Sequence, residues 1–246
     1  MKRSEWKWAA NLLTAGNLFF GFWAILQVIQ GNYLMACWLI LFASICDGLD
    51  GKLARFTRCS SEIGIELDSL VDVVSFGVAP SVLLYSISFH KFGFPGVILA
   101  SIPLFFGVMR LARFNLTATT TEKKTYDGLP IPMMANTLVT FILFNFALWD
   151  GFHLEVMLLP LVISLALLML SHVHYDTMPR FTIRDTRKNM LKLIFIFAGI
   201  ILVAIKPSVL FFPLMLIYVL KGLVNSIFGL NAEEELEEIY EDEPVI

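Results

Sequence analysis

Long apolar stretches recur from one end of the chain to the other, and short polar segments separate them. Each stretch is about 20 residues long, the length that a helix needs to cross a hydrocarbon core of about 30 Å. The fold class expected is therefore an all-α integral membrane protein. The pattern predicts eight transmembrane helices, at residues 8–29, 33–57, 65–88, 94–116, 129–149, 153–172, 190–206 and 208–229.

The composition agrees with a location in the membrane. Hydrophobic residues make up 57% of the chain and include 22 Phe, whereas soluble domains are about half apolar. The three cysteines, Cys37, Cys46 and Cys59, have no metal-ligand spacing, so neither a disulfide framework nor a zinc site is expected. Membrane lipids are expected partners, and nucleic acids are not.

Basic residues gather at one set of helix ends, and only Lys91 and Lys206 fall on the other side. Short loops rich in Lys and Arg face the cytoplasm, which predicts a multi-pass protein of the cell membrane. With an even number of spans, both termini are expected in the cytoplasm.

The chain divides into three regions. Residues 1–172 hold the first six predicted helices, and residues 173–230 hold a cytoplasmic connection and two additional helices. Residues 231–246 include eight of the 21 acidic residues. Such a charged segment with few apolar anchors is expected to be a disordered tail.

Four aspartates stand near the cytoplasmic ends of two neighbouring predicted helices. Asp47 and Asp50 are three residues apart and Asp68 and Asp72 are four apart, so each pair lies on one helix face. An ionised carboxylate in apolar surroundings costs at least a few kcal/mol, and converging pairs also repel each other. Two divalent metal ions would balance these charges. All-oxygen ligands favour Mg²⁺ or Mn²⁺, and two such ions suit phosphoryl transfer.

Small and basic residues accompany the aspartates. Gly51 directly follows the first pair and Gly64 lies one turn before the second, and glycines let a ligand approach the backbone. Arg55 offers a planar fork for phosphate oxygens, and Ala54 keeps the wall beside it shallow. The alternative for Arg55 is an ion pair with an aspartate, or extension to the membrane interface.

Residues 47–72 read Asp, two residues, Asp-Gly, two residues, Ala-Arg, eight residues, Gly, three residues, Asp, three residues, Asp. This resembles the signature of the CDP-alcohol phosphotransferases at every fixed position. The resemblance implies a six-helix catalytic core within residues 1–172, a two-metal site open to the cytoplasm, release of CMP, and a homodimer. It also implies that the four aspartates bind the metals and that Asp72 is the general base. By the same resemblance, the nucleotide site is lined by Gly51, Ala54, Arg55 and Gly64.

Residues 13–22, 110–115 and 128–132 are similar to segments of the membrane-type phosphatidylserine synthases in that family. The similarity implies L-serine as the acceptor and CDP-diacylglycerol or CDP-archaeol as the donor, since generic apolar surfaces do not distinguish the lipid tails. The serine hydroxyl would give its proton to the general base and attack the lipid-side phosphorus. Thr14 and Asn17 on the first span are candidates for hydrogen bonds to the nucleotide.

Further polar residues are candidates for binding serine or phosphate. A zwitterionic serine needs a cation for its carboxylate, and Arg110 and Arg113 at the end of the fourth span can supply one. Asn115, Lys123 and Lys124 follow in the chain and can close the opening of the same site. For the arginines the alternative is anchoring at the membrane surface, and for the lysines contact with anionic lipids is the default.

Two other functions compete with this reading. The same chemistry with another acceptor is the nearer one: glycerol 3-phosphate, inositol phosphate or an aminoalcohol. A divalent-cation transporter is the other, because clustered membrane carboxylates also mark ion paths. A transporter site is expected near the membrane midplane, whereas these aspartates lie toward helix ends, beside glycines and an arginine that an ion path does not require.

Overall fold

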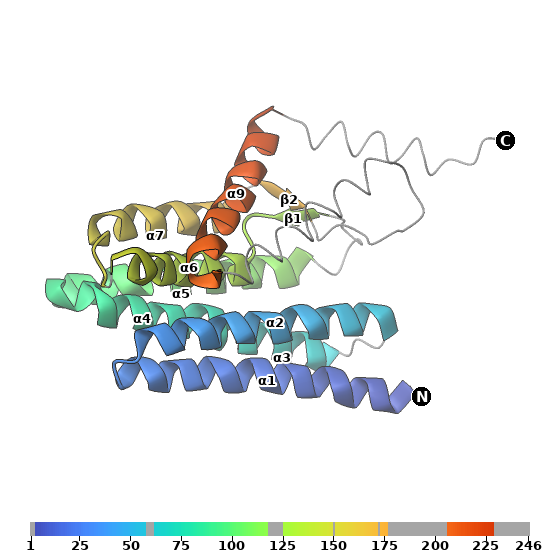
Figure 1. Ribbon diagram of the computed structural model, residues 1–246. Coiled ribbons are helices and arrows are strands. Elements are labelled where there is room, and N and C mark those ends of the chain that lie inside the picture. The colour runs from blue at the N-terminus through green and yellow to red at the C-terminus, as the bar shows by residue number, and fades with distance from the viewer. Residues whose placement is uncertain are drawn as a thin grey trace.

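The computed structural model shows a bundle of long helices. It describes residues 3–57, 62–117, 125–149, 151–171, 173–176 and 206–228. Up to α7, the long helices lie side by side and follow one another in opposite directions (Figure 1). The helical elements are α1 (Arg3–Ile29), α2 (Tyr33–Thr57), α3 (Glu62–Asp72), η1 (Val73–Val78), α4 (Ala79–Ile87), η2 (Phe89–Phe92), α5 (Phe94–Thr117), α6 (Ile131–Trp149), α7 (Glu155–Leu170) and α9 (Pro207–Phe228).

The helices coincide with the predicted spans to within a few residues. Among the described residues, six helical segments are long and apolar enough to cross a membrane, one of them formed by α3, η1 and α4 together. α7 matches the sixth predicted span but has only 16 residues. Most of the predicted span 190–206 and the whole tail 231–246 lie outside the described residues. A helical membrane protein is therefore confirmed, whereas the total of eight spans and the division into three regions stay predictions.

A tight turn joins α1 to α2. The Gly31 amide donates to the Val28 carbonyl and the Asn32 amide to the Gln27 carbonyl, which is the hydrogen-bond pattern of a Schellman helix end. Gly31 takes the positive φ of 79° that this turn requires. Because the connection is so short, α1 and α2 pack against each other as an antiparallel pair.

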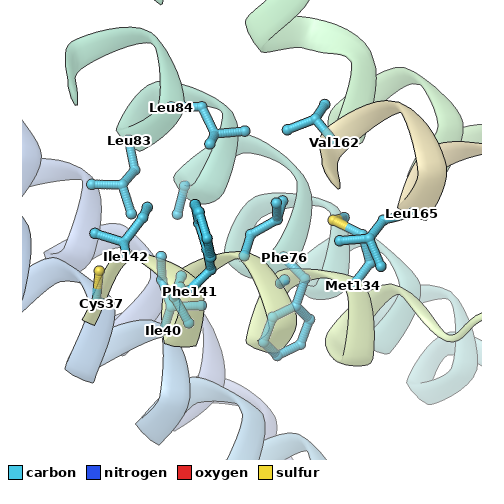
Figure 2. Close-up of a cluster of buried hydrophobic side chains, with 14 of the residues drawn as sticks. Cys37, Ile40, Phe76, Leu83, Leu84, Met134, Phe141, Ile142, Val162 and Leu165 are labelled. Carbon is cyan, nitrogen blue, oxygen red and sulfur yellow. The ribbon is translucent and has the colours of Figure 1, made fainter. Parts of the chain in front are cut away.

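The core of the bundle forms around α6, which is buried along most of its length. Figure 2 shows side chains of α2, η1, α4, α6 and α7 meeting there, including Ile40, Phe76, Leu83, Ile142 and Leu165. Large apolar side chains also cover the outside of the bundle. In water such a surface would drive aggregation, but hydrocarbon chains are an apolar solvent for it.

A two-stranded sheet, which the sequence did not predict, joins the two polar connections. β1 (Thr125–Asp127) pairs antiparallel with β2 (His174–Asp176), and Tyr126 lies opposite Tyr175. Three-residue strands that lie far apart in the sequence leave no periodic pattern. The helical fold class holds, with this small sheet added at one end of the bundle.

α9 lies across α6 at a steep angle in Figure 1. Near its start, Phe212 makes ring contacts with Phe141 and Phe144 of α6. Near its end, the Tyr175 hydroxyl donates to the Val219 carbonyl at 3.5 Å. Burial raises the pKa of Tyr175 to about 12, so this hydroxyl keeps its proton at physiological pH. α9 therefore joins the core helices to the small sheet.

Gly128, between β1 and α6, lies in close contact with the end of α7. Its φ is 81°, and a Cβ at this position would overlap the Met169 carbonyl oxygen at the end of α7. Gly31 has nearly the same φ, 79°, but a Cβ there would meet nothing within 4 Å. A substitution at Gly31 therefore tests backbone strain alone, whereas a substitution at Gly128 tests backbone strain together with close packing.

We expect Gly128→Ala to lower the melting temperature of the detergent-solubilised protein more than Gly31→Ala does. Both variants lose about 1–2 kcal/mol to the left-handed backbone, and Gly128→Ala loses about 1–3 kcal/mol more to overpacking. Differential scanning fluorimetry measures both variants beside the parent. Equal losses would show that α7 does not pack against Gly128.

Candidate functional site

The two motif helices bring their aspartates together. Asp47 and Asp50 lie toward the end of α2, and Asp68 and Asp72 lie on α3. Carboxylate oxygens of Asp47, Asp50 and Asp68 lie within 4.8 Å of one another, and the Asp72 carboxyl group lies near those of Asp47 and Asp68. The convergence predicted from residue spacing is therefore present in the structure.

The four carboxyl groups are buried or partly buried. Asp50 is 5% exposed and Asp72 is 7% exposed, whereas Asp47 and Asp68 are partly buried. Like charges at this separation repel strongly where the local dielectric constant is low. A cation bound among them would remove most of that repulsion.

The donor set fits a hard divalent cation. Among the described residues, the acidic, His and Cys side chains that converge as possible metal ligands are the carboxylates of Asp47, Asp50 and Asp68, and carboxylate oxygens are the ligands that Mg²⁺ and Mn²⁺ prefer. Oxygens that ligate one Mg²⁺ stand about 2.0–2.1 Å from it and hence at most about 4.2 Å apart. Asp47, Asp50 and Asp68 therefore have the chemistry of such a site, the 4.8 Å within which their oxygens lie is slightly wider than one Mg²⁺ requires, and Asp72 adjoins them.

α1 supplies hydrogen bonds to both motif helices. Thr14 Oγ1 donates to Asp50 Oδ2 at 2.9 Å, and Asn17 Nδ2 donates to Asp72 Oδ1 at 3.4 Å. Because Thr14 and Asn17 are three residues apart, they share one face of α1. Both residues were expected to contact the nucleotide, and their contacts with the aspartates were not predicted from the sequence. Their predicted role in binding the nucleotide stays a prediction.

The structure describes some of the side chains that were predicted to line the nucleotide site. A Cβ on Gly51 would meet nothing within 4 Å, so there is open space beside this residue for a ligand. Gly64 lies in the first turns of α3. Ala54 and Arg55 belong to the last turns of α2, and their side chains lie outside the described part of the structure.

The candidates on α5 occupy different places. Arg110 is 5% exposed. Arg113 donates to the carbonyls of Leu170 and Ser171 at 3.0 and 3.4 Å, so it binds the C-terminal end of α7, where cations are favourable. Arg113 thus has a structural role that the sequence did not predict.

Asn115 joins α5 to the aspartate helix. Asn115 Nδ2 donates to Ser69 Oγ at 3.2 Å, and Ser69 directly follows Asp68 in the chain. Asn115 is therefore the α5 candidate that the described contacts bring next to the cluster. Lys123 and Lys124 lie outside the described residues.

A membrane-embedded bundle that gathers carboxylates near one end, beside an open space at Gly51, has the features of a metal-dependent transferase. The model of the CDP-alcohol phosphatidyltransferase family matches residues 7–173, which is well over half of the chain and includes all four aspartates. The chain belongs to the CDP-alcohol phosphatidyltransferase family.

Three relatives show which members of the family this chain is similar to. A CDP-diacylglycerol–serine O-phosphatidyltransferase of Helicobacter pylori, strain J99, is 35% identical over 220 residues, 89% of this chain and 90% of that protein. The archaetidylserine synthase of Methanothermobacter thermautotrophicus is 37% identical over 167 residues, 67% of this chain and 68% of that protein. A CDP-diacylglycerol–serine O-phosphatidyltransferase of Methanocaldococcus jannaschii is 38% identical over 194 residues, 78% of this chain and 84% of that protein.

We expect Asp50→Asn to weaken Mn²⁺ binding by at least about tenfold. Changes to groups around a metal already cost about 10–100-fold in affinity, and this substitution removes a charged ligand while an oxygen remains to accept from Thr14. Electron paramagnetic resonance of free Mn²⁺ measures the affinity of the purified protein.

Glu66→Gln is the matched control, because Glu66 is an exposed carboxylate on the same helix as Asp68. It removes the same charge and should leave Mn²⁺ affinity within about twofold of the parent, since an exposed charge is screened by solvent. Equal Mn²⁺ affinities for parent and Asp50→Asn would exclude Asp50 from the metal site.

Proposed function

We propose that this protein transfers a phosphatidyl-type group from CDP-diacylglycerol or CDP-archaeol to the hydroxyl of L-serine and releases CMP. The observation that carries the proposal is the convergence of Asp47, Asp50, Asp68 and Asp72 in a member of the CDP-alcohol phosphatidyltransferase family. The choice of serine rests on relatives named for serine transfer that align with up to 89% of the chain.

In the proposed mechanism the four aspartates would hold two divalent ions, Mg²⁺ or Mn²⁺, and Asp72 is also the general base. The ions would supply positive charge to the pyrophosphate oxygens of the donor. Asp72 takes the proton of the serine hydroxyl. The serine oxygen then forms a bond to the lipid-side phosphorus, and the bond from that phosphorus to the CMP oxygen breaks. Charge, protons and bonds balance when CMP leaves as an anion.

The nucleotide is proposed to lie along α2 and α3 at Gly51, Ala54, Arg55 and Gly64. The open space beside Gly51 supports this placement, because a phosphate or ribose can approach the backbone where no Cβ intervenes. The Arg55 guanidinium is suited to hold phosphate oxygens in a bidentate manner.

The acceptor is proposed to bind between α3 and α5. Asn115 supports this, since its bond to Ser69 brings it beside the aspartate helix. Arg110 is the candidate for the serine carboxylate. Arg113 already binds the end of α7, so we propose that it shapes the acceptor site through that helix. Lys123 and Lys124 stay candidates for closing the site.

The protein is proposed to lie in the cell membrane with the aspartates and both termini on the cytoplasmic side. The support is the basic residues that accompany this end of the bundle, since such loops stay in the cytoplasm. The donor headgroup, serine and CMP would then all meet at one membrane face. A homodimer is part of the proposal by analogy with the family.

The acceptor preference is tested by CMP release. Purified protein receives CDP-diacylglycerol with Mg²⁺ or Mn²⁺ and, separately, serine, glycerol 3-phosphate, inositol 1-phosphate or ethanolamine. We expect CMP release that depends on serine. Release with another acceptor alone would keep the chemistry and overturn the substrate. If CDP-diacylglycerol and CDP-archaeol are both inert with every acceptor, and proteoliposomes take up Mn²⁺, the protein is a transporter.

The base assignment is tested by Asp72→Asn. An amide cannot take the serine proton, so we expect CMP release to fall by at least about 100-fold. Binding of CDP-diacylglycerol should stay measurable, because the side chain introduced in this variant would still offer an amide oxygen to a metal ion. Thermal stabilisation of the protein in the presence of Mn²⁺ measures this binding. Turnover close to that of the parent would remove Asp72 from the role of base.

A further inference from the structure

The surroundings of Asp72 extend beyond the motif helices to α1. Asn17 is fully buried, at 0% exposure, and its Nδ2 donates to Asp72 Oδ1 at 3.4 Å. This is longer than the range of about 2.7–3.2 Å typical of N–H···O bonds, and catalytic hydrogen bonds are often long before substrate binds. Because a carboxylate only accepts hydrogen bonds, the contact also sets which way the Asn17 amide faces.

Asn17 is in turn held by the helix that carries Asp72. Ser75, which is fully buried, donates from Oγ to the Asn17 backbone carbonyl at 3.1 Å. The side chain of Asn17 therefore contacts Asp72 while its backbone contacts Ser75, three residues further along the same helix. The two bonds fix both the position of α1 and the direction of the amide.

Gly21 makes this close approach possible. A Cβ on Gly21 would overlap the Cα and the side chain of Ser75. Gly21 lies one turn after Asn17 on the same face of α1. A larger residue at this position would push α1 away from Ser75, and the Asn17 amide would move away from Asp72 with it.

The helix is π-helical at this point. η1 begins immediately after Asp72, and the Ala79 amide donates to the Val74 carbonyl, five residues back. π-turns are rare and frequently occur at functional sites. Here the wide turn carries Ser75, which contacts α1, directly behind the proposed base.

We propose that Asn17 is a positioning residue for Asp72, held in place by Ser75 and Gly21. Its amide holds Oδ1 and so fixes the orientation in which the Asp72 carboxylate would meet a metal ion and the acceptor hydroxyl. This inference rests on the proposed function, because it assumes that Asp72 accepts the proton. It differs from the nucleotide contact that the sequence suggested for Asn17, and the two roles have different kinetic consequences.

The test compares Asn17→Ala and Asn17→Asp in the full-length protein, by CMP release with CDP-diacylglycerol, serine and Mn²⁺. We expect kcat to fall by about 10–100-fold in Asn17→Ala, as for other groups that orient a ligand or base. KM for both substrates should stay within about threefold. Asn17→Asp should be at least as inactive, although it has the shape of asparagine, because it removes the donor and adds a carboxylate facing Asp72.

A third variant, Asn17→Leu, separates positioning from packing, because it keeps roughly the volume of asparagine without a donor or a charge. If Asn17 only fills space, Asn17→Leu keeps more activity than Asn17→Ala, and the inference fails. It also fails if kcat is unchanged while KM for the CDP-lipid rises, since Asn17 would then bind the nucleotide. Asn32→Ala is the control: Asn32 is an exposed asparagine in the turn after α1, and its loss should leave kcat within about twofold.

Ser75→Ala provides a second route if the Asn17 variants do not fold. It removes the bond to the Asn17 carbonyl and little volume, so we expect kcat to fall several-fold at unchanged KM and Mn²⁺ affinity. An unchanged kcat would overturn the role of Ser75 and the proposal with it.

Measurements on the parent enzyme separate a failure of this inference from a failure of the proposed function. If the parent releases CMP only with another acceptor, the substrate is wrong and the same variants are compared with that acceptor. If the parent and Asp72→Asn are equally active, the inference falls together with the base assignment.

Discussion

Four carboxylates within membrane-spanning helices are the constraint on which the first half of the structure depends. Each ionised group is costly in such surroundings, and their proximity adds repulsion. The protein offsets part of this with hydrogen bonds from α1, where Thr14 reaches Asp50 and Asn17 reaches Asp72. Bound cations would offset the rest. The packing of α1 against both motif helices is therefore part of the site as well as part of the fold.

The second half of the chain supports the same end of the bundle from outside. Arg113 holds the last carbonyls of α7, and Gly128 allows the start of α6 to approach the same helix end. Tyr175 links the small sheet to α9. These contacts tie α5, α6, α7 and α9 together. Anchoring of this kind limits how far the walls of an active site can move when substrates bind.

Sequence patterns predicted the parts of this protein that depend on length and period. Apolar runs located the described spans, and the spacing of Asp47, Asp50, Asp68 and Asp72 predicted their convergence. The contacts of Arg113 and Asn17 were not predictable in this way, because a charge near a helix end and an amide in the middle of a helix each have several possible partners. The π-turn at Ser75 and the pairing of β1 with β2 also depend on tertiary packing, which leaves no local pattern in the sequence.

The interior beyond the aspartates explains why the site favours chemistry at one face over passage of an ion. One turn from Asp47, Ser44 accepts a hydrogen bond of 2.8 Å from Asn136. Toward the start of α2, apolar side chains that are fully buried follow, among them Ile40 of α2 and Phe76 of η1 (Figure 2). A cation moving in that direction would lose its oxygen ligands in a medium that does not replace them, at a cost of several kcal/mol. Apolar side chains of the described core thus lie beyond the carboxylates on that side, which disfavours the passage of an ion.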